Sequence, residues 1–93
     1  MPYCQASRDA ILTHVSPTVF REGPYRFFFF SREEARIHVH VICASGEAKF
    51  WLDPDVELAM SNGIRAHESR EIQRIIERRK EEIVNAWNQH FAT

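Results

Sequence analysis

Two histidines carry the clearest chemical potential in the chain: His38 and His40, in the string Ile37-His-Val-His-Val41. In a strand, side chains two residues apart point to the same face, so both imidazoles should lie together. Lys49 and Arg26 are expected on that face as well. One imidazole could act as base and the other as acid near neutral pH, while the two cations stabilise phosphorane charge. This set predicts a metal-free, His-dependent ribonuclease as one hypothesis.

The same histidines could instead chelate a metal. A protein metal site needs at least a third protein ligand, and Glu47 is the nearest candidate to His38 and His40. That arrangement would serve a metal-dependent hydrolase. Two histidines on a polar strand face are also common without any ligand, so no resident cofactor is expected.

Aromatic side chains share the expected histidine face and favour binding over catalysis. Phe28, Phe30 and Trp51, with Arg36 beside them, could stack nucleic-acid bases, as aromatic platforms on open sheets do. A protein partner or a second copy of the chain could equally cover them. Because exposed apolar patches usually mark interfaces, a protein partner or homo-oligomer is the preferred interpretation, with nucleic acid as a further possibility.

A β-hairpin over residues 36–52 would position these groups. Alternation places Ile37, Val39 and Val41 on one face, and Ala48, Phe50 and Leu52 on the matching face of the return strand. The matching register pairs Val39 with Phe50 and His40 with Lys49, leaving a four-residue loop at 43–46.

The hairpin is preceded by a predicted strand–turn–strand unit. Val19-Phe20-Arg21 forms the first strand, Glu22-Gly-Pro24 the turn, and Tyr25–Ser31 the second strand. Tyr25, Phe27 and Phe29 are predicted to point inward, because this phase keeps Arg26 out of the core. Residues 1–16 are expected to be a weakly structured N-terminal extension, and 17–93 a single domain.

The remainder predicts two helices. Asp53-Pro54 resembles an N-cap followed by a first-turn proline, and Asn62-Gly63 a stop signal, which indicates a short helix between them. Apolar residues at spacings of three and four predict a long helix from about residue 66 to 91. The predicted fold class is α+β: a three- or four-stranded antiparallel β-meander packed on that long C-terminal helix.

Composition limits the function classes. The 93 residues include twelve basic and thirteen acidic side chains, a net charge of −1 that argues against nonspecific phosphate attraction. The longest apolar run is four phenylalanines, far short of a membrane span, so no membrane association is expected. The N-terminal residues lack a signal-peptide pattern, and two cysteines make no disulfide framework. A cytoplasmic location is expected.

Several strings resemble an uncharacterised bacterial family, domain of unknown function 4160. They are Ser16–Ser31, Ile37-His-Val-His-Val41, Gly46-Glu-Ala-Lys-Phe-Trp-Leu-Asp-Pro54, Glu57-Leu-Ala and Glu82-Ile-Val-Asn-Ala-Trp87. The chain departs from the family at Arg36-Ile37, where many members have Pro-Pro, and at Arg65, where many have a Ser or Thr cap. The resemblance implies a gene beside another small gene, as in toxin–antitoxin pairs, and carries no established catalytic residue.

The leading hypothesis is therefore a small protein-interaction module that acts with a neighbouring gene product in a toxin–antitoxin-like pair. A His-dependent ribonuclease, a metal hydrolase or a nucleic-acid-binding module, each using the same sheet face, remains the alternative.

Overall fold

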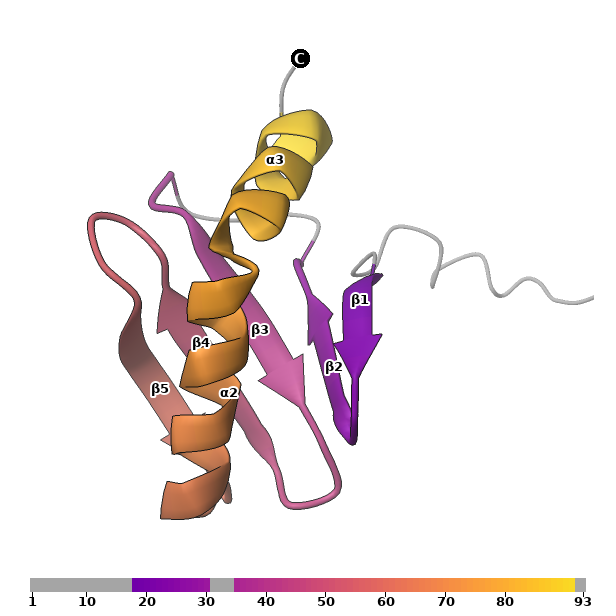
Figure 1. The fold of residues 1–93 in the computed structure, drawn as a ribbon, viewed down its shortest axis with the longest axis vertical. Helices are drawn as coiled ribbons and strands as arrows, with labels where there is room; N and C mark the ends of the chain where they lie inside the picture. The colour runs from indigo at the N-terminus through magenta and orange to yellow at the C-terminus, as the bar shows by residue number, and fades with distance from the viewer. Residues whose placement is uncertain (1–17, 31–34, 92–93) are drawn as a thin grey trace, which may run out of the picture.

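Five consecutive strands form one antiparallel sheet in order along the chain, in a computed structural model that describes residues 18–30 and 35–91 (Figure 1). The strands are β1 (Thr18–Glu22), β2 (Tyr25–Phe28), β3 (His38–Ile42), β4 (Glu47–Trp51) and β5 (Glu57–Asn62). Each neighbouring pair is joined by a short connection except β2 and β3, so the sheet is a simple meander.

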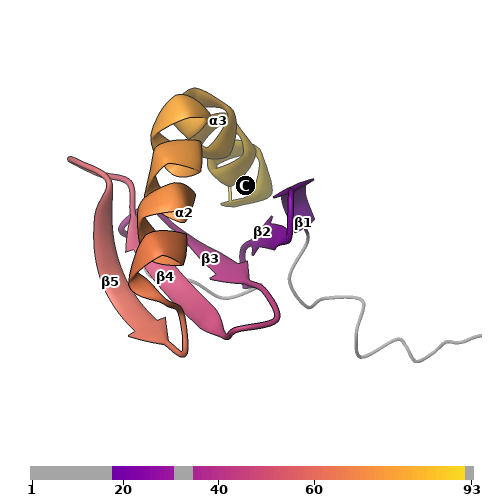
Figure 2. The same ribbon diagram turned by 60° about the horizontal axis from the view of Figure 1, so that its bottom comes forward.

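Two helices follow the sheet, α2 (Ala66–Arg78) and α3 (Lys80–Phe91), and both lie on one of its faces (Figures 1 and 2). The helix-covered face holds the core. Its fully buried members include Phe27, Phe29 and Phe50 of the β2–β4 region and Ile72, Ile76 and Ile83 of the helices. Burying such side chains stabilises the fold by about 1.5–3 kcal/mol each. The domain is therefore a two-layer α+β structure.

The predicted register of the central hairpin is confirmed. Val39 pairs with Phe50 and His40 with Lys49, and the loop closes through two backbone bonds between Cys43 and Gly46. The predicted phase of β2 is also confirmed, because Tyr25, Phe27 and Phe29 are all buried in the core.

The short helix predicted between residues 53 and 62 is wrong, and the sheet has five strands instead of three or four. Residues 57–62 form β5, which pairs with β4 from Trp51↔Glu57 to Glu47↔Asn62. Gly46 explains part of this pairing, since a Cβ there would lie 2.0 Å from the carbonyl oxygen of Asn62. Only glycine lets the two backbones approach so closely. The backbone pairing of β5 with β4 therefore prevails over the helix-capping preference of Asp53 and Pro54.

The single long C-terminal helix is also wrong in detail, because Arg79 separates α2 from α3. The backbone hydrogen bonds continue through this point, from Arg79 N–H to the carbonyl of Ile75 and from Ile83 N–H to the carbonyl of Arg79. The Arg79 guanidinium lies 3.5 Å from the ring centre of Phe20 and bonds Glu22 at 2.9 Å. The break between α2 and α3 thus lies at the residue that makes these contacts with β1.

The predicted N-terminal extension, residues 1–16, lies outside the described residues, and a single domain over 17–93 stays a prediction. Neither described helix is long and apolar enough to cross a membrane.

Candidate functional site

The side of the sheet opposite the core residues Val39 and Phe50, here called the outer face, carries the predicted site residues of the strands. Only at its His38 end does a helix reach this side, through Trp87 of α3. Directly opposed residues in an antiparallel sheet point the same way, so the ladder defines this face in three rows. The rows are Arg21, Arg26, Ile42, Glu47 and Asn62; Thr18, Phe28, His40, Lys49 and Met60; and His38, Trp51 and Glu57.

His38 and His40 are brought together as predicted, with ring centres 5.2 Å apart, but both are buried. His38 is 0% exposed and His40 is 8% exposed. The His38 ring contacts Trp51 and Trp87, and its Nδ1 donates to the carbonyl of Arg36 at 2.7 Å, which requires the proton on Nδ1. The two imidazoles are therefore buried by surrounding rings, whereas the sequence predicted them on an exposed polar face.

His40 is held in a second group of rings. Its centre lies 5.5 Å from that of Phe28, in a stacked arrangement, and 4.2 Å from that of Phe30. Phe28 is itself buried, while Phe30 is exposed. Arg26 covers the Phe28 ring at 4.7 Å and donates from Nε to the hydroxyl of Thr18.

Two cationic side chains lie over the ring of Trp51. The Arg36 guanidinium lies 4.3 Å and the Lys49 ammonium 4.4 Å from its ring centre. Such contacts contribute about 0.5–1 kcal/mol each at exposed sites. The arrangement places positive charge beside an aromatic surface.

The arrangement of the described residues does not support the metal-site hypothesis. Glu47 sits opposite Ile42, one row removed from His40. Within residues 18–30 and 35–91, no three His, Cys, Asp or Glu side chains gather as a metal site requires.

Exposed apolar side chains complete the outer face. Ile42 and Met60 lie on it, Ile42 at 40% and Met60 at 42% exposure. Leu58 is equally exposed at 43%, yet a β-bulge in β5 sets it opposite Phe50, on the helix side of the sheet. Leu58 and Met60 were not predicted on the sheet because the expected short helix between residues 53 and 62 covered them, and Ile42 was not among the residues predicted for this face.

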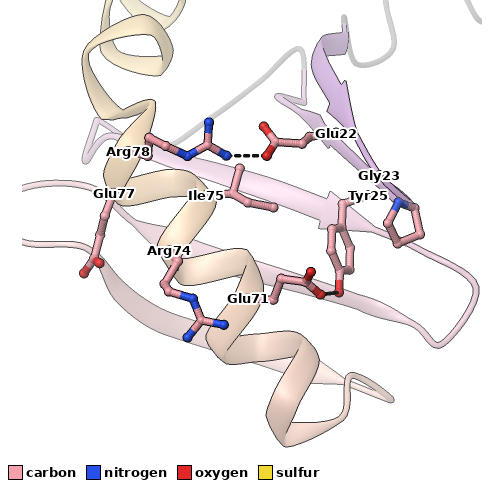
Figure 3. A pocket seen from close by; sticks show the side chains of 9 residues that line it. Glu22, Gly23, Tyr25, Glu71, Arg74, Ile75, Glu77 and Arg78 are labelled. Atoms are coloured by element: carbon pink, nitrogen blue, oxygen red, sulfur yellow. Dashed lines mark hydrogen bonds and ion pairs between the residues drawn. The ribbon is translucent and has the colours of Figure 1, made fainter.

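A cleft of about 620 Å³ lies elsewhere, between the β1–β2 turn and α2 (Figure 3). At its floor the Tyr25 hydroxyl donates to Glu71 Oε1 at 2.6 Å, and burial raises the pKa of that hydroxyl far above its usual value of 10.0. Its lining residues are Glu22, Gly23, Pro24, Tyr25, Glu71, Arg74, Ile75, Glu77 and Arg78. None of the site residues predicted from the sequence lines this cleft. Its two walls are separated by about half of the chain, so no local sequence pattern indicates that they meet.

Glu22 closes one side of the cleft through ion pairs to Arg78 and Arg79. Hydrogen bonding from Arg79, together with Arg78, holds the pKa of the Glu22 carboxyl below its usual value of 4.5. Arg79 also bonds Glu82 at 2.9 Å, so β1 is joined to both helices.

Comparison with known proteins agrees with the resemblance described above. The family model "Domain of unknown function (DUF4160)" matches residues 25–88, well over half of the chain. No curated protein and no solved structure gives a significant match. The matched segment contains β2 to β5 and most of the helical layer. The chain therefore belongs to the DUF4160 family, domain of unknown function 4160.

Proposed function

We propose that this protein is a small interaction module that binds a different protein chain through its outer face. The observation that carries the proposal is the exposure of Ile42 and Met60 on the outer face, in rows other than that of His38, where Trp87 of α3 makes contact. An antiparallel sheet with one solvated face usually alternates apolar-in with polar-out. Aliphatic side chains that break this pattern on the solvated side are typical of a binding surface.

Docking on the face is favoured over addition of a strand at an edge. The ladder of β1 shifts register between Thr18 and Phe20, and that of β5 shifts opposite Lys49 and Phe50. Both edge strands are thus bulged, and bulges are a common way in which proteins block pairing at a sheet edge.

Charge favours a different, acidic partner over a second copy of the chain. The outer face carries Arg21, Arg26 and Lys49, with Arg36 on Trp51, against the carboxylates Glu47 and Glu57. The whole chain has a net charge of −1, so the cationic excess is local to this face. A symmetric dimer would place the same positive surface against itself. A neighbouring gene product, as in a toxin–antitoxin-like pair, fits this expectation.

The catalytic and nucleic-acid alternatives draw less support from the same geometry. A catalytic base or acid must come within hydrogen-bond reach of its substrate, and the His38 ring is fully buried. Bases that stack on Trp51 would have to displace Arg36 and Lys49 from its ring. A protein partner needs neither change.

Co-expression with the product of the adjacent gene tests the proposal. Met60→Lys should weaken capture about tenfold or more, since placing a charge in an apolar contact exceeds the ~1.4 kcal/mol that a tenfold change requires. Leu58→Lys is the matched control, because it has the same exposure and strand but lies on the helix side. Failure of the wild-type protein to capture the product, or equal loss in both variants, would contradict the proposal.

A further inference from the structure

Arg36 is held in a fixed position on the outer face by three contacts. Its Nε donates to the carbonyl of Asp53 at 2.9 Å, and its guanidinium lies 4.3 Å from the ring centre of Trp51. Its third contact is an ion pair with Glu57, at 3.6 Å from the guanidinium nitrogen. The first two contacts fix the orientation of the guanidinium plane while it stays partly open to solvent.

The Glu57 contact is the weak one. At 3.6 Å the nitrogen–oxygen separation exceeds that of a charge-assisted hydrogen bond, about 2.7–2.9 Å. Both side chains are well exposed, Arg36 at 42% and Glu57 at 68%, so solvent screens the pair. A better-placed carboxylate could therefore replace Glu57 at little cost.

We infer that Arg36 and Trp51 form an anchor for a carboxylate of the partner protein, an Asp or Glu side chain, next to an apolar residue that contacts Met60. This inference rests on the proposed function and specifies the partner's chemistry. Met60 lies one row from Glu57 on the same face of β5, close enough for one short segment to reach both. Tryptophan and arginine are also the residues most enriched at energetic centres of interfaces.

A protein carboxylate fits this anchor better than a nucleic-acid phosphate. A guanidinium binds either group through two parallel N–H donors. Nucleic-acid binding, however, draws its affinity from several neutralised phosphates, whereas the cationic excess on the outer face is small and Glu47 and Glu57 interrupt it. Apolar Met60 beside the anchor also matches a protein segment.

The test selects random 12-residue peptides displayed on phage against the immobilised wild-type protein, and then measures each enriched peptide by fluorescence anisotropy. Enriched sequences should place Asp or Glu beside a large apolar residue. Changing that acid to its amide should weaken binding about tenfold, and Arg36→Gln should weaken it equally. On Arg36→Gln the acid-to-amide change should have no further effect, which is the signature of a direct pair. Glu57→Gln should strengthen binding, because it removes the competing carboxylate.

The outcomes separate the inference from the proposed function. Binding that Met60→Lys abolishes but Arg36→Gln leaves intact overturns the carboxylate anchor and keeps the interaction face. Enriched peptides that lack Asp and Glu would likewise overturn the carboxylate anchor and keep the interaction face. No enrichment, or binding insensitive to Met60→Lys, overturns both. Equally tight, Arg36-dependent binding of a 20-nucleotide single strand would overturn the choice of a protein carboxylate.

Discussion

Replacing His38 tests whether the paired histidines support the fold or are available for chemistry. The His38 ring is fully buried against Trp51 and Trp87, and its Nδ1–H bonds the Arg36 carbonyl. Large buried aromatics cost about 3–5 kcal/mol when cut to alanine, and the smaller imidazole about 2. The lost hydrogen bond adds about 1 kcal/mol. His38→Ala should therefore lower the free energy of unfolding by about 3 kcal/mol.

Urea unfolding followed by tryptophan fluorescence measures this change, and the midpoint on heating should fall by about 15 °C for a domain of this size. His38→Phe keeps a ring and loses only the donor, so about 1–2 kcal/mol should be lost. His67→Ala is the matched control, because His67 is exposed on α2, and should change stability by less than about 0.5 kcal/mol. If the urea midpoint of His38→Ala equals that of the wild type, the structural role of His38 is refuted and a chemical role for it is favoured.

Three further perturbations follow from single contacts. Gly46→Ala places a Cβ 2.0 Å from a carbonyl oxygen of β5, so circular dichroism melts should show destabilisation of about 1–3 kcal/mol; a wild-type melting temperature would contradict the β4–β5 pairing. Burial and the bond to Glu71 raise the pKa of the Tyr25 hydroxyl, so the stability that it contributes is complete below about pH 10 and is lost above it; Tyr25→Phe should flatten that alkaline loss in urea titrations. Hydrogen bonding from Arg79 lowers the pKa of Glu22, so its contribution is present above about pH 4.5 and lost as pH falls further; Glu22→Gln should remove that part of the acid dependence.

Local patterns were sufficient to predict the hairpin that holds the histidines. Alternation of apolar and polar residues determines which side chains share a face, and only one register matches both arms, so Val39↔Phe50 and His40↔Lys49 are confirmed. The inward phase of Tyr25 and Phe27 is confirmed on the same grounds.

Features that depend on distant contacts could not be predicted in this way. β5 exists because it pairs with β4 and because Gly46 admits its backbone, neither of which changes the local appearance of residues 57–62. The break at Arg79 accompanies its contacts to Phe20 and Glu22 in β1, more than fifty residues away. The burial of His38 depends on Trp87 of α3, which alternation along a strand cannot show.

The central claim is that a protein partner docks on the outer face. Its most direct test is hydrogen–deuterium exchange of the labelled chain with and without the co-expressed neighbouring gene product. Side-chain packing on the outer face should slow exchange of the β3–β5 amides and of the Arg36 region, and leave the amides of α2 and α3 unchanged. Protection confined to the helices or to the cleft beside Tyr25, or no protection on complex formation, would contradict the account.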